Sequence, residues 1–153
     1  MSNDFEMSIS IPTDNDGYIL LQCEHCGTFF KLTPGDVEND GVLDIFCPSC
    51  GLKSECYLTE EVLDLAMNMA ENKVNEMLED MFKGLERGTR NGLVKFKTGK
   101  RLPKKSEEPI RSSIEALDVC EFVCCHRTAK VKPLLKITGA YCPFCGVKDY
   151  EIE

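Results

Sequence analysis

Cysteine pairs separated by two residues recur along this chain of 153 residues, and thiolates at that spacing are metal ligands. The first two pairs are Cys23 with Cys26 and Cys47 with Cys50. Because Zn²⁺ prefers four thiolate or imidazole ligands in a tetrahedron, two such turns complete one coordination shell. Glycines follow both turns, where a positive φ lets backbone N–H groups point at the sulfurs. These four cysteines therefore predict a zinc site.

A second zinc site is predicted near the C-terminus, where Cys142 and Cys145 repeat the C-P-x-C-G turn of Cys47 to Gly51. Lysine falls five positions after Cys26, and again five positions after Cys125. An aliphatic residue follows the lysine in both places. Cys125 therefore matches Cys26 and becomes the third predicted ligand of this site.

The fourth ligand of the second site stays open in the sequence. The residue that would match Cys23 is Phe122, which cannot bind a metal. The remaining candidates are Cys124 and Cys120, with His126 as a third choice. We expect a thiolate from this crowded segment to complete the shell.

Ten cysteines in a small secreted protein would indicate disulfides, but this sequence shows no export signal and no run of eighteen apolar residues. Paired C-x2-C turns then favour reduced thiolates that bind metal. We expect a cytoplasmic protein with no membrane partner. Each cysteine module is too small for a large core, so the metal must supply much of its stability.

Residues 59–88 show a helical period, because apolar side chains recur at steps of three and four. The stripe consists of Leu63, Met67, Ala70, Val74, Met77, Met81 and Leu85. Such a helix would be about 40 Å long, which is more than either cysteine module needs. Its methionine-rich stripe suits an adaptable surface, so we expect it to bind a protein partner or a second copy of the same helix.

The net charge of −8 conceals a strong asymmetry. Residues 1–58 alone carry −8, whereas nine Lys and Arg against one Glu lie between Lys83 and Lys105. A basic segment of this kind predicts phosphate contacts with nucleic acid, and the alternative is that it neutralises the acidic helix or the first module. The candidate nucleic-acid-binding residues are Lys95, Lys97, Lys100, Arg101, Lys104, Lys105, Arg127, Lys130 and Lys132.

Both cysteine modules resemble zinc ribbons, and the first, through Cys23, Cys26, Cys47 and Cys50, is similar to the transcription factor IIB type. The resemblance implies small antiparallel sheets with metal-binding turns at one end, and contacts with nucleic acid or protein. The expected fold is α+β, with two antiparallel β zinc ribbons joined by one long helix and a basic connector. Its parts are residues 1–58, 59–88, 89–111 and 112–153.

These features favour a non-enzymatic binding or adaptor protein with two Zn²⁺ ions. Nucleic acid would bind to the basic connector and the C-terminal ribbon, whereas a protein partner or homodimer would use the helix and the acidic N-terminal ribbon. The Cys142-Pro-Phe-Cys145 turn is similar to a redox-active motif, but only eight residues follow it, too few for the βαβ framework of that family. We therefore expect neither an enzyme nor a small-molecule substrate.

Overall fold

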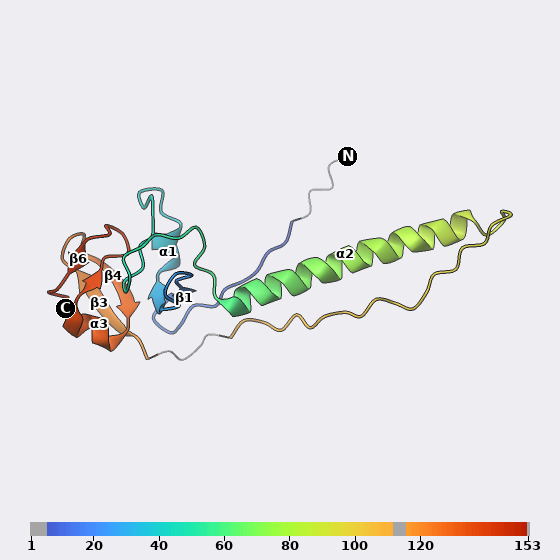
Figure 1. Cartoon of the computed structure of the whole chain (residues 1–153). Helices are drawn as coiled ribbons and strands as arrows, with labels where there is room; N and C mark the ends of the chain where they lie inside the picture. The colour runs from blue at the N-terminus through green and yellow to red at the C-terminus, as the bar shows by residue number, and fades with distance from the viewer. Residues whose placement is uncertain (1–5, 112–115, 153) are drawn as a thin grey trace. The chain divides into compact units, whose positions relative to one another are not determined.

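The computed structural model describes residues 6–111 and 116–152, and it has the expected α+β architecture of small antiparallel sheets and one long helix (Figure 1). The chain divides into two compact units. The paired-ribbon unit consists of Ile11–Glu60 and Ile110–Glu153. The helical unit consists of Glu61–Pro109 together with the N-terminal residues up to Ser10.

Two sheets and a pair of short helices make up the paired-ribbon unit. The strands are β1 (Ile19–Gln22), β2 (Phe29–Leu32), β3 (Asp118–Phe122), β4 (Arg127–Val131), β5 (Ala140–Tyr141) and β6 (Lys148–Asp149). The short helices are α1 (Pro34–Val37) and α3 (Pro133–Thr138), and the long helix is α2 (Glu60–Gly88). Both α1 and α3 have proline in the first turn, where the missing N–H costs no helical hydrogen bond.

The two ribbons are joined edge to edge into one four-stranded sheet of order β1-β2-β4-β3. Each ribbon contributes an antiparallel hairpin, and the hairpins meet where Lys31 of β2 lies opposite Lys130 of β4. These are the two lysines that fall five positions after Cys26 and Cys125 in the sequence. Although the long helix and the connector lie between the two ribbons in the sequence, both ribbons belong to one compact unit.

A reciprocal pair of hydrogen bonds joins the downstream turns of the two ribbons. The Phe46 N–H donates to the Pro143 carbonyl at 2.8 Å, and the Tyr141 N–H donates to the Pro48 carbonyl at 2.9 Å. Phe46 and Tyr141 hold equivalent positions, each directly before a C-P-x-C-G turn. The ribbons are therefore related by an approximate twofold axis inside one chain.

The apolar residues 43–46, which lead into the Cys47 turn, would suit a third strand of the first ribbon, but the described chain has only a single bridge there, between Phe46 and Lys53. The equivalent segment of the second ribbon forms β5 and β6, with Tyr141 opposite Lys148. In the segment before Phe46, Ile45 packs against the core whereas Leu43 is 92% exposed.

One hydrophobic core serves both ribbons. Leu21, Phe30 and Leu32 of the first ribbon lie in the same buried cluster as Phe122 and Val131 of the second. Tyr57 belongs to the same cluster, and its ring packs edge-on against the Phe30 ring with 5.6 Å between the ring centroids. Sharing a core offsets the small size of each ribbon, because buried area rises with the size of the unit.

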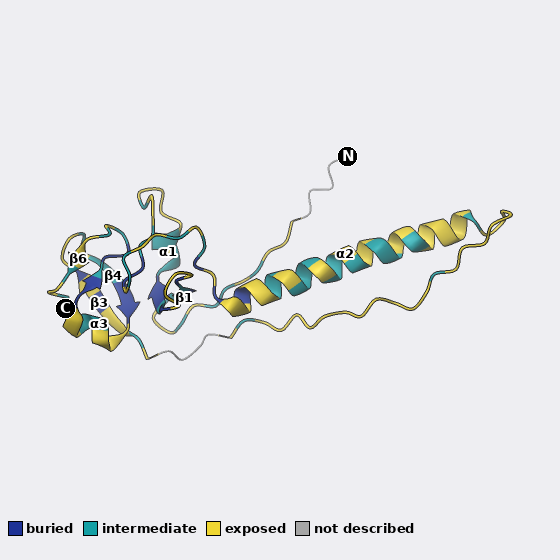
Figure 2. Ribbon diagram, in the orientation of Figure 1, coloured by how far each residue is buried: buried dark blue, intermediate teal, exposed yellow. Residues whose placement is uncertain are grey.

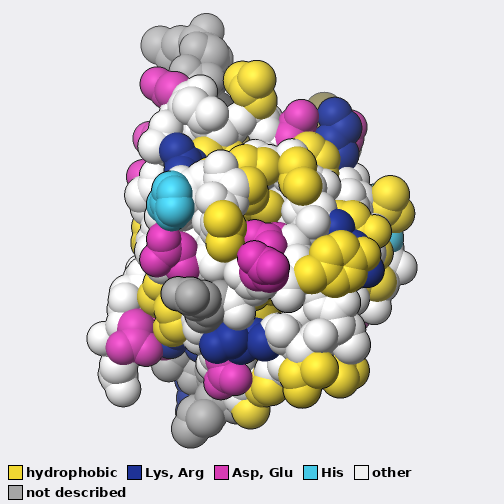
Figure 3. All heavy atoms as spheres, turned by 90° about the vertical axis from the view of Figure 1, so that its left-hand side faces the viewer, with side chains coloured by type: hydrophobic (Ala, Val, Ile, Leu, Met, Phe, Trp, Pro, Cys, Tyr) yellow, Lys and Arg dark blue, Asp and Glu magenta, His cyan; other side chains and the backbone are white. Residues whose placement is uncertain are grey.

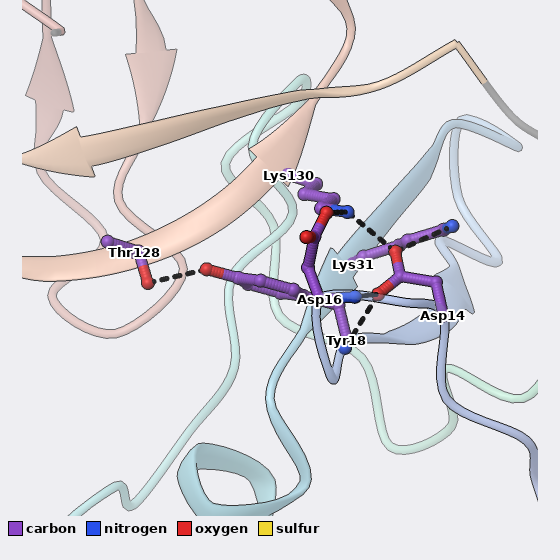
Figure 4. Close-up of polar contacts among 6 residues, drawn as sticks. All are labelled: Asp14, Asp16, Tyr18, Lys31, Thr128 and Lys130. Atoms are coloured by element: carbon purple, nitrogen blue, oxygen red, sulfur yellow. Dashed lines mark hydrogen bonds and ion pairs between the residues drawn. The ribbon is translucent and has the colours of Figure 1, made fainter.

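Asp14 connects the central lysines of the two ribbons (Figure 4). Its Oδ2 lies 3.1 Å from Lys31 Nζ and 2.7 Å from Lys130 Nζ, while Oδ1 accepts the backbone N–H groups of Asp16 and Tyr18. Burial would raise the pKa of Asp14, but the hydrogen bonds from Lys130, the Tyr18 backbone and Lys31 lower it far below its usual range. Lys130 Nζ also lies 2.6 Å from Asp16 Oδ2, so two carboxylates, Asp14 and Asp16, together neutralise the two buried lysines.

Asp14→Asn is expected to reduce the free energy of unfolding by about 3 kcal/mol, because the buried Lys31 ammonium loses its carboxylate. Asp16→Asn is the matched control and should cost less than about 1 kcal/mol, because Asp16 is 65% exposed. Denaturant unfolding of the metal-loaded protein, followed by tyrosine fluorescence, measures both. Equal losses of unfolding free energy in the two variants would contradict the role of Asp14 as the buried partner of Lys31.

The Asp14 contribution also has a defined pH dependence. Since the folded pKa lies below the unfolded value of about 3.9, the stabilisation is fully present above that value. It is lost as the pH falls toward the lower folded pKa, so Asp14→Asn should matter less in strong acid than at neutral pH.

Most of the helical unit is α2, from Glu61 onward, and the connector that runs back beside it (Figure 1). Asn72 binds the connector by two hydrogen bonds. Its Nδ2 donates to the Lys105 carbonyl at 2.8 Å, and its Oδ1 accepts the Lys105 N–H at 2.7 Å. Asn68 Nδ2 donates to the Ser106 carbonyl, and Lys105 Nζ lies near Glu71. An asparagine face of the helix therefore binds its own connector.

The apolar stripe of α2 lies on another face and stays exposed in the described chain. Figure 2 shows exposed and half-buried positions alternating along α2. The exposed residues of the stripe are Leu63, Met67, Val74, Met77, Met81 and Leu85. The predicted period is confirmed, but the connector does not cover this stripe. Among the described residues, no helix is both long and apolar enough to cross a membrane.

Candidate metal centres

Four turns of the same geometry build the metal centres. In three of them a glycine N–H, of Gly27, Gly51 or Gly146, donates to the carbonyl four residues earlier, and each of these glycines has φ of 72°. In the fourth turn the His126 N–H donates to the Phe122 carbonyl at 2.8 Å, and His126 has φ of 55°. The second ribbon therefore keeps the turn although it lacks the glycine, because histidine is among the residues that tolerate the left-handed region.

The first group consists of Cys23, Cys26, Cys47 and Cys50, whose sulfurs all lie within 4.8 Å of one another. Cys23 Sγ is 3.8 Å from Cys50 Sγ, and Cys26 Sγ is 3.6 Å from Cys47 Sγ. A tetrahedral zinc with Zn–S bonds of about 2.3 Å requires sulfur–sulfur distances of about 3.8 Å. The thiolate donor set and its spacing therefore fit such an ion.

The second group consists of Cys124, Cys125, Cys142 and Cys145, again with all sulfurs within 4.8 Å. Cys125 Sγ lies 3.6 Å from Cys142 Sγ. Phe122 occupies the place of Cys23 and is fully buried in the core, so that turn position provides packing instead of a ligand. Cys124, two residues further along the same turn, completes the group.

Cys120 and His126 lie outside the second group. The Cys120 side chain is buried, and its Sγ donates to the Ala129 carbonyl at 3.4 Å. Burial raises the pKa of the Cys120 thiol to about 11, so it stays protonated in the core. The His126 side chain is exposed, and its Nδ1 lies 3.1 Å from Glu121 Oε1. Cys56 is half-buried and belongs to neither group.

The ligand thiols differ strongly in acidity when no cation is present. Burial would raise the pKa of Cys26, but hydrogen bonds from Thr28 and neighbouring cysteines lower it to about 6. Burial raises the pKa of Cys47 and of Cys142 well above the usual thiol range, and that of Cys124 to about 11. A divalent cation is needed to offset four neighbouring thiolates, so metal affinity should fall as the pH falls and protons compete.

Cys124→Ala is expected to weaken metal binding at the second group about 100-fold, since each of four ligands provides roughly a quarter of the binding free energy. Cys120→Ala is the matched control, because it removes the nearest non-ligand thiol, and it should leave metal affinity unchanged. Competition with a chelator of known affinity measures both variants. The assignment would fail if Cys120→Ala lowered the affinity and Cys124→Ala did not.

The candidate phosphate-binding residues occupy different environments. Lys130 is only 8% exposed and paired with Asp14 and Asp16, whereas Lys132 is exposed. Arg127 is half-buried, 3.8 Å from Asp36 and 5.2 Å from the ring centre of Phe144. On the face in Figure 3, Lys and Arg form small separate groups among apolar and acidic side chains. The second ribbon therefore presents little continuous basic surface there.

The connector cations also fall into two classes. Arg101 and Lys105 lie next to Glu79 and Glu71 of the helix. The other four predicted connector residues, Lys95, Lys97, Lys100 and Lys104, are exposed and form no ion pair within the described residues. The structure thus shows partial neutralisation of the acidic helix by its own connector.

Sequence reasoning missed the aromatic contacts between the two centres. A Cβ on Gly51 would lie 2.8 Å from the Tyr141 ring, and one on Gly146 would lie 3.0 Å from the Phe46 ring. Each ribbon therefore places an aromatic ring against the glycine of the other metal-binding turn. The signal was an aromatic residue directly before both C-P-x-C-G turns.

No protein family, curated protein or solved structure matches this chain in comparisons of sequence and fold. The two four-cysteine groups are zinc-ribbon-like in their spacing and sulfur geometry, and each can hold a metal ion. Similarity to the transcription factor IIB type stays a prediction from the residue pattern.

Proposed function

We propose that this protein is a non-catalytic binding protein in which two Zn²⁺ ions hold the paired ribbons and the basic connector binds nucleic acid. The observation that carries the proposal is the set of exposed cations around the end of α2 and along the connector. Arg87, Arg90, Lys95, Lys97, Lys100 and Lys104 are all exposed and form no ion pair with other described residues.

Exposed lysines and arginines suit phosphate contacts, because they release counterions from nucleic acid without first breaking buried ion pairs. Lys130 and Arg127 are already engaged inside the paired-ribbon unit. These contacts favour the connector over the C-terminal ribbon as the binding surface.

The metal centres support a structural role. Four thiolates saturate a tetrahedral Zn²⁺ ion, which leaves no open position for a substrate or an activated water. Zinc also fits the donor set, because soft thiolates in a tetrahedral arrangement select it over harder cations. In this proposal the ions cross-link the turns and do no chemistry on a ligand.

Binding to a labelled duplex and to a labelled single strand at about 50 mM salt tests the proposal. The protein should bind at least one of them, with an affinity that falls steeply as salt is added. Changing Lys95, Lys97, Lys100 and Lys104 to Gln should remove most of the binding and reduce the salt dependence by up to about four phosphate contacts.

A control for that experiment is Lys132→Gln with Lys148→Gln, which neutralises two exposed cations of the second ribbon. This variant should bind nearly as well as the unmodified protein. Failure of the unmodified protein to bind either nucleic acid at low salt would reject the proposal.

Self-association through α2 is a second candidate function, favoured by the exposed stripe. Leu63, Met67, Ala70, Val74, Met77 and Met81 alternate at steps of four and three, the spacing that pairs two helices in a coiled coil. The asparagine face already binds the connector, so the stripe is free for a second copy of this chain.

Light scattering over a range of concentrations tests this second function. The unmodified protein should approach the mass of two chains, and Val74→Glu with Met77→Glu should keep it monomeric. Lys83→Glu changes the net charge by the same amount off the stripe and should still associate. A constant monomer mass for the unmodified protein would reject self-association.

A further inference from the structure

A cationic pocket of about 400 Å³ lies where α2 ends and the connector turns back. It is lined by Lys83, Glu86, Arg87, Thr89, Arg90, Lys95, Phe96 and Lys97. Its volume is in the range of small-ligand sites. Five cations therefore face one cavity together with a single carboxylate.

Specific hydrogen bonds fold this turn. Thr89 Oγ1 donates to the Leu85 carbonyl at 2.9 Å and accepts the Phe96 N–H at 3.3 Å. The Gly92 N–H donates to the Thr89 carbonyl at 3.1 Å. Thr89 thus fixes both the end of the helix and the return of the connector, so the cations beyond the helix are held near those of its last turns.

The charges around the pocket are not balanced within the described chain. Lys83 lies 3.9 Å from Glu79, and the one acid of the pocket, Glu86, accepts a hydrogen bond from Thr98. Lys83 and Arg87 suit the negative end of the helix dipole, but Arg90, Lys95 and Lys97 follow the helix. The five cations and one carboxylate that line the pocket leave it with a net positive charge, which favours a ligand with more than one negative charge.

Phe96 adds a second kind of contact. Its ring lies 6.0 Å from the Phe82 ring at an interplanar angle of 31°, so Phe82 supports one side. Phe96 remains 40% exposed and lines the same pocket as the cations. A supported aromatic ring beside phosphate-binding cations is the arrangement on which unpaired bases stack.

We infer that this pocket binds a single-stranded segment of nucleic acid, with its phosphates on Arg87, Arg90, Lys95 and Lys97 and one base on Phe96. This inference rests on the proposed nucleic-acid function and specifies its form and its place. A duplex would offer the same phosphates, but its stacked bases cannot reach the Phe96 ring.

Fluorescence anisotropy with a labelled strand of about 15 nucleotides, the matching duplex and a mononucleotide, at about 50 mM salt, tests the inference. The unmodified protein should bind the single strand more tightly than the duplex or the mononucleotide. Phe96→Leu keeps an apolar contact with Phe82 but removes the stacking face. It should weaken single-strand binding about tenfold and leave duplex binding unchanged.

A matched pair of charge reversals locates the site. Arg90→Glu with Lys95→Glu changes two pocket cations, whereas Lys100→Glu with Lys104→Glu changes two connector cations outside the pocket. The first pair should weaken single-strand binding at least tenfold more than the second. Unchanged circular dichroism and metal content would show that both variants fold.

The outcomes separate the two claims. If the unmodified protein binds no nucleic acid, the proposed function fails as a whole. If it binds, but prefers duplex or mononucleotide, or if both charge reversals weaken it equally and Phe96→Leu has no effect, the function stands and this inference is overturned.

Discussion

Chelation of metal is expected to unfold the paired ribbons in a single transition that releases both ions together. A structural zinc site supplies about 10–16 kcal/mol, which is as large as the about 5–15 kcal/mol that stabilises a typical domain. The two ribbons also share a sheet and a buried cluster, so one cannot lose its fold without exposing the other.

Tyrosine near-ultraviolet circular dichroism can follow this transition selectively. All four tyrosines, Tyr18, Tyr57, Tyr141 and Tyr150, lie in the paired-ribbon unit, and the chain has no tryptophan. The tyrosine signal should disappear in step with the release of two ions per chain. Release in two separate steps, or an unchanged signal after both ions have left, would contradict the expectation.

Gly51→Ala is expected to destabilise the paired-ribbon unit by about 3 kcal/mol and to weaken metal binding at the second group. A residue with a Cβ is strained in the left-handed backbone conformation of Gly51, which costs about 1–2 kcal/mol. The new Cβ would also lie 2.8 Å from the Tyr141 ring, and this overlap adds about 1–3 kcal/mol. Because Tyr141 directly precedes Cys142, moving its ring disturbs a ligand of the other ribbon.

Gly27→Ala is the matched control for this prediction. Gly27 has the same φ of 72°, but its added Cβ would meet nothing within 4 Å. It should therefore cost only the backbone strain, and chemical denaturation should show Gly51→Ala as clearly worse. In a Tyr141→Ala background the two glycine variants should become equal. Equal effects with Tyr141 present would disprove the ring contact.

The parts of the structure that the sequence predicts well are those encoded locally. The C-x2-C turns of the first group fix their own geometry within five residues, and the glycine after each turn marks the positive φ. The long helix follows from a period that one segment carries by itself. The β1–β2 hairpin similarly follows from two apolar and β-prone runs, residues 18–22 and 28–32, on either side of one C-x2-C turn.

The second metal group could be predicted only in part, because one turn position serves two purposes. Phe122 takes the Cys23 position for core packing, and the ligand moves to Cys124 at the tip of the turn. The sequence shows the first change but leaves Cys124 and Cys120 as alternatives for the fourth ligand. Burial of the Cys120 side chain in the shared core, which is a long-range result, separates them.

The pairing of the ribbons is also a long-range result. Lys31 and Lys130 had matching sequence positions, but nothing local says that matching residues lie opposite each other in one sheet. The same holds for the helix, whose period reveals the apolar stripe but not the asparagine face that binds the connector.

The pairing of the two ribbons makes the helical unit an insertion between them in the sequence. The chain leaves the paired-ribbon unit after Glu60 and returns at Ile110, between the two halves of the sheet. For the ribbons, everything between is a loop, and doubling the length of a flexible loop costs only about 0.6 kcal/mol. Changes in the length or sequence of residues 61–109 should therefore cost the paired ribbons little stability.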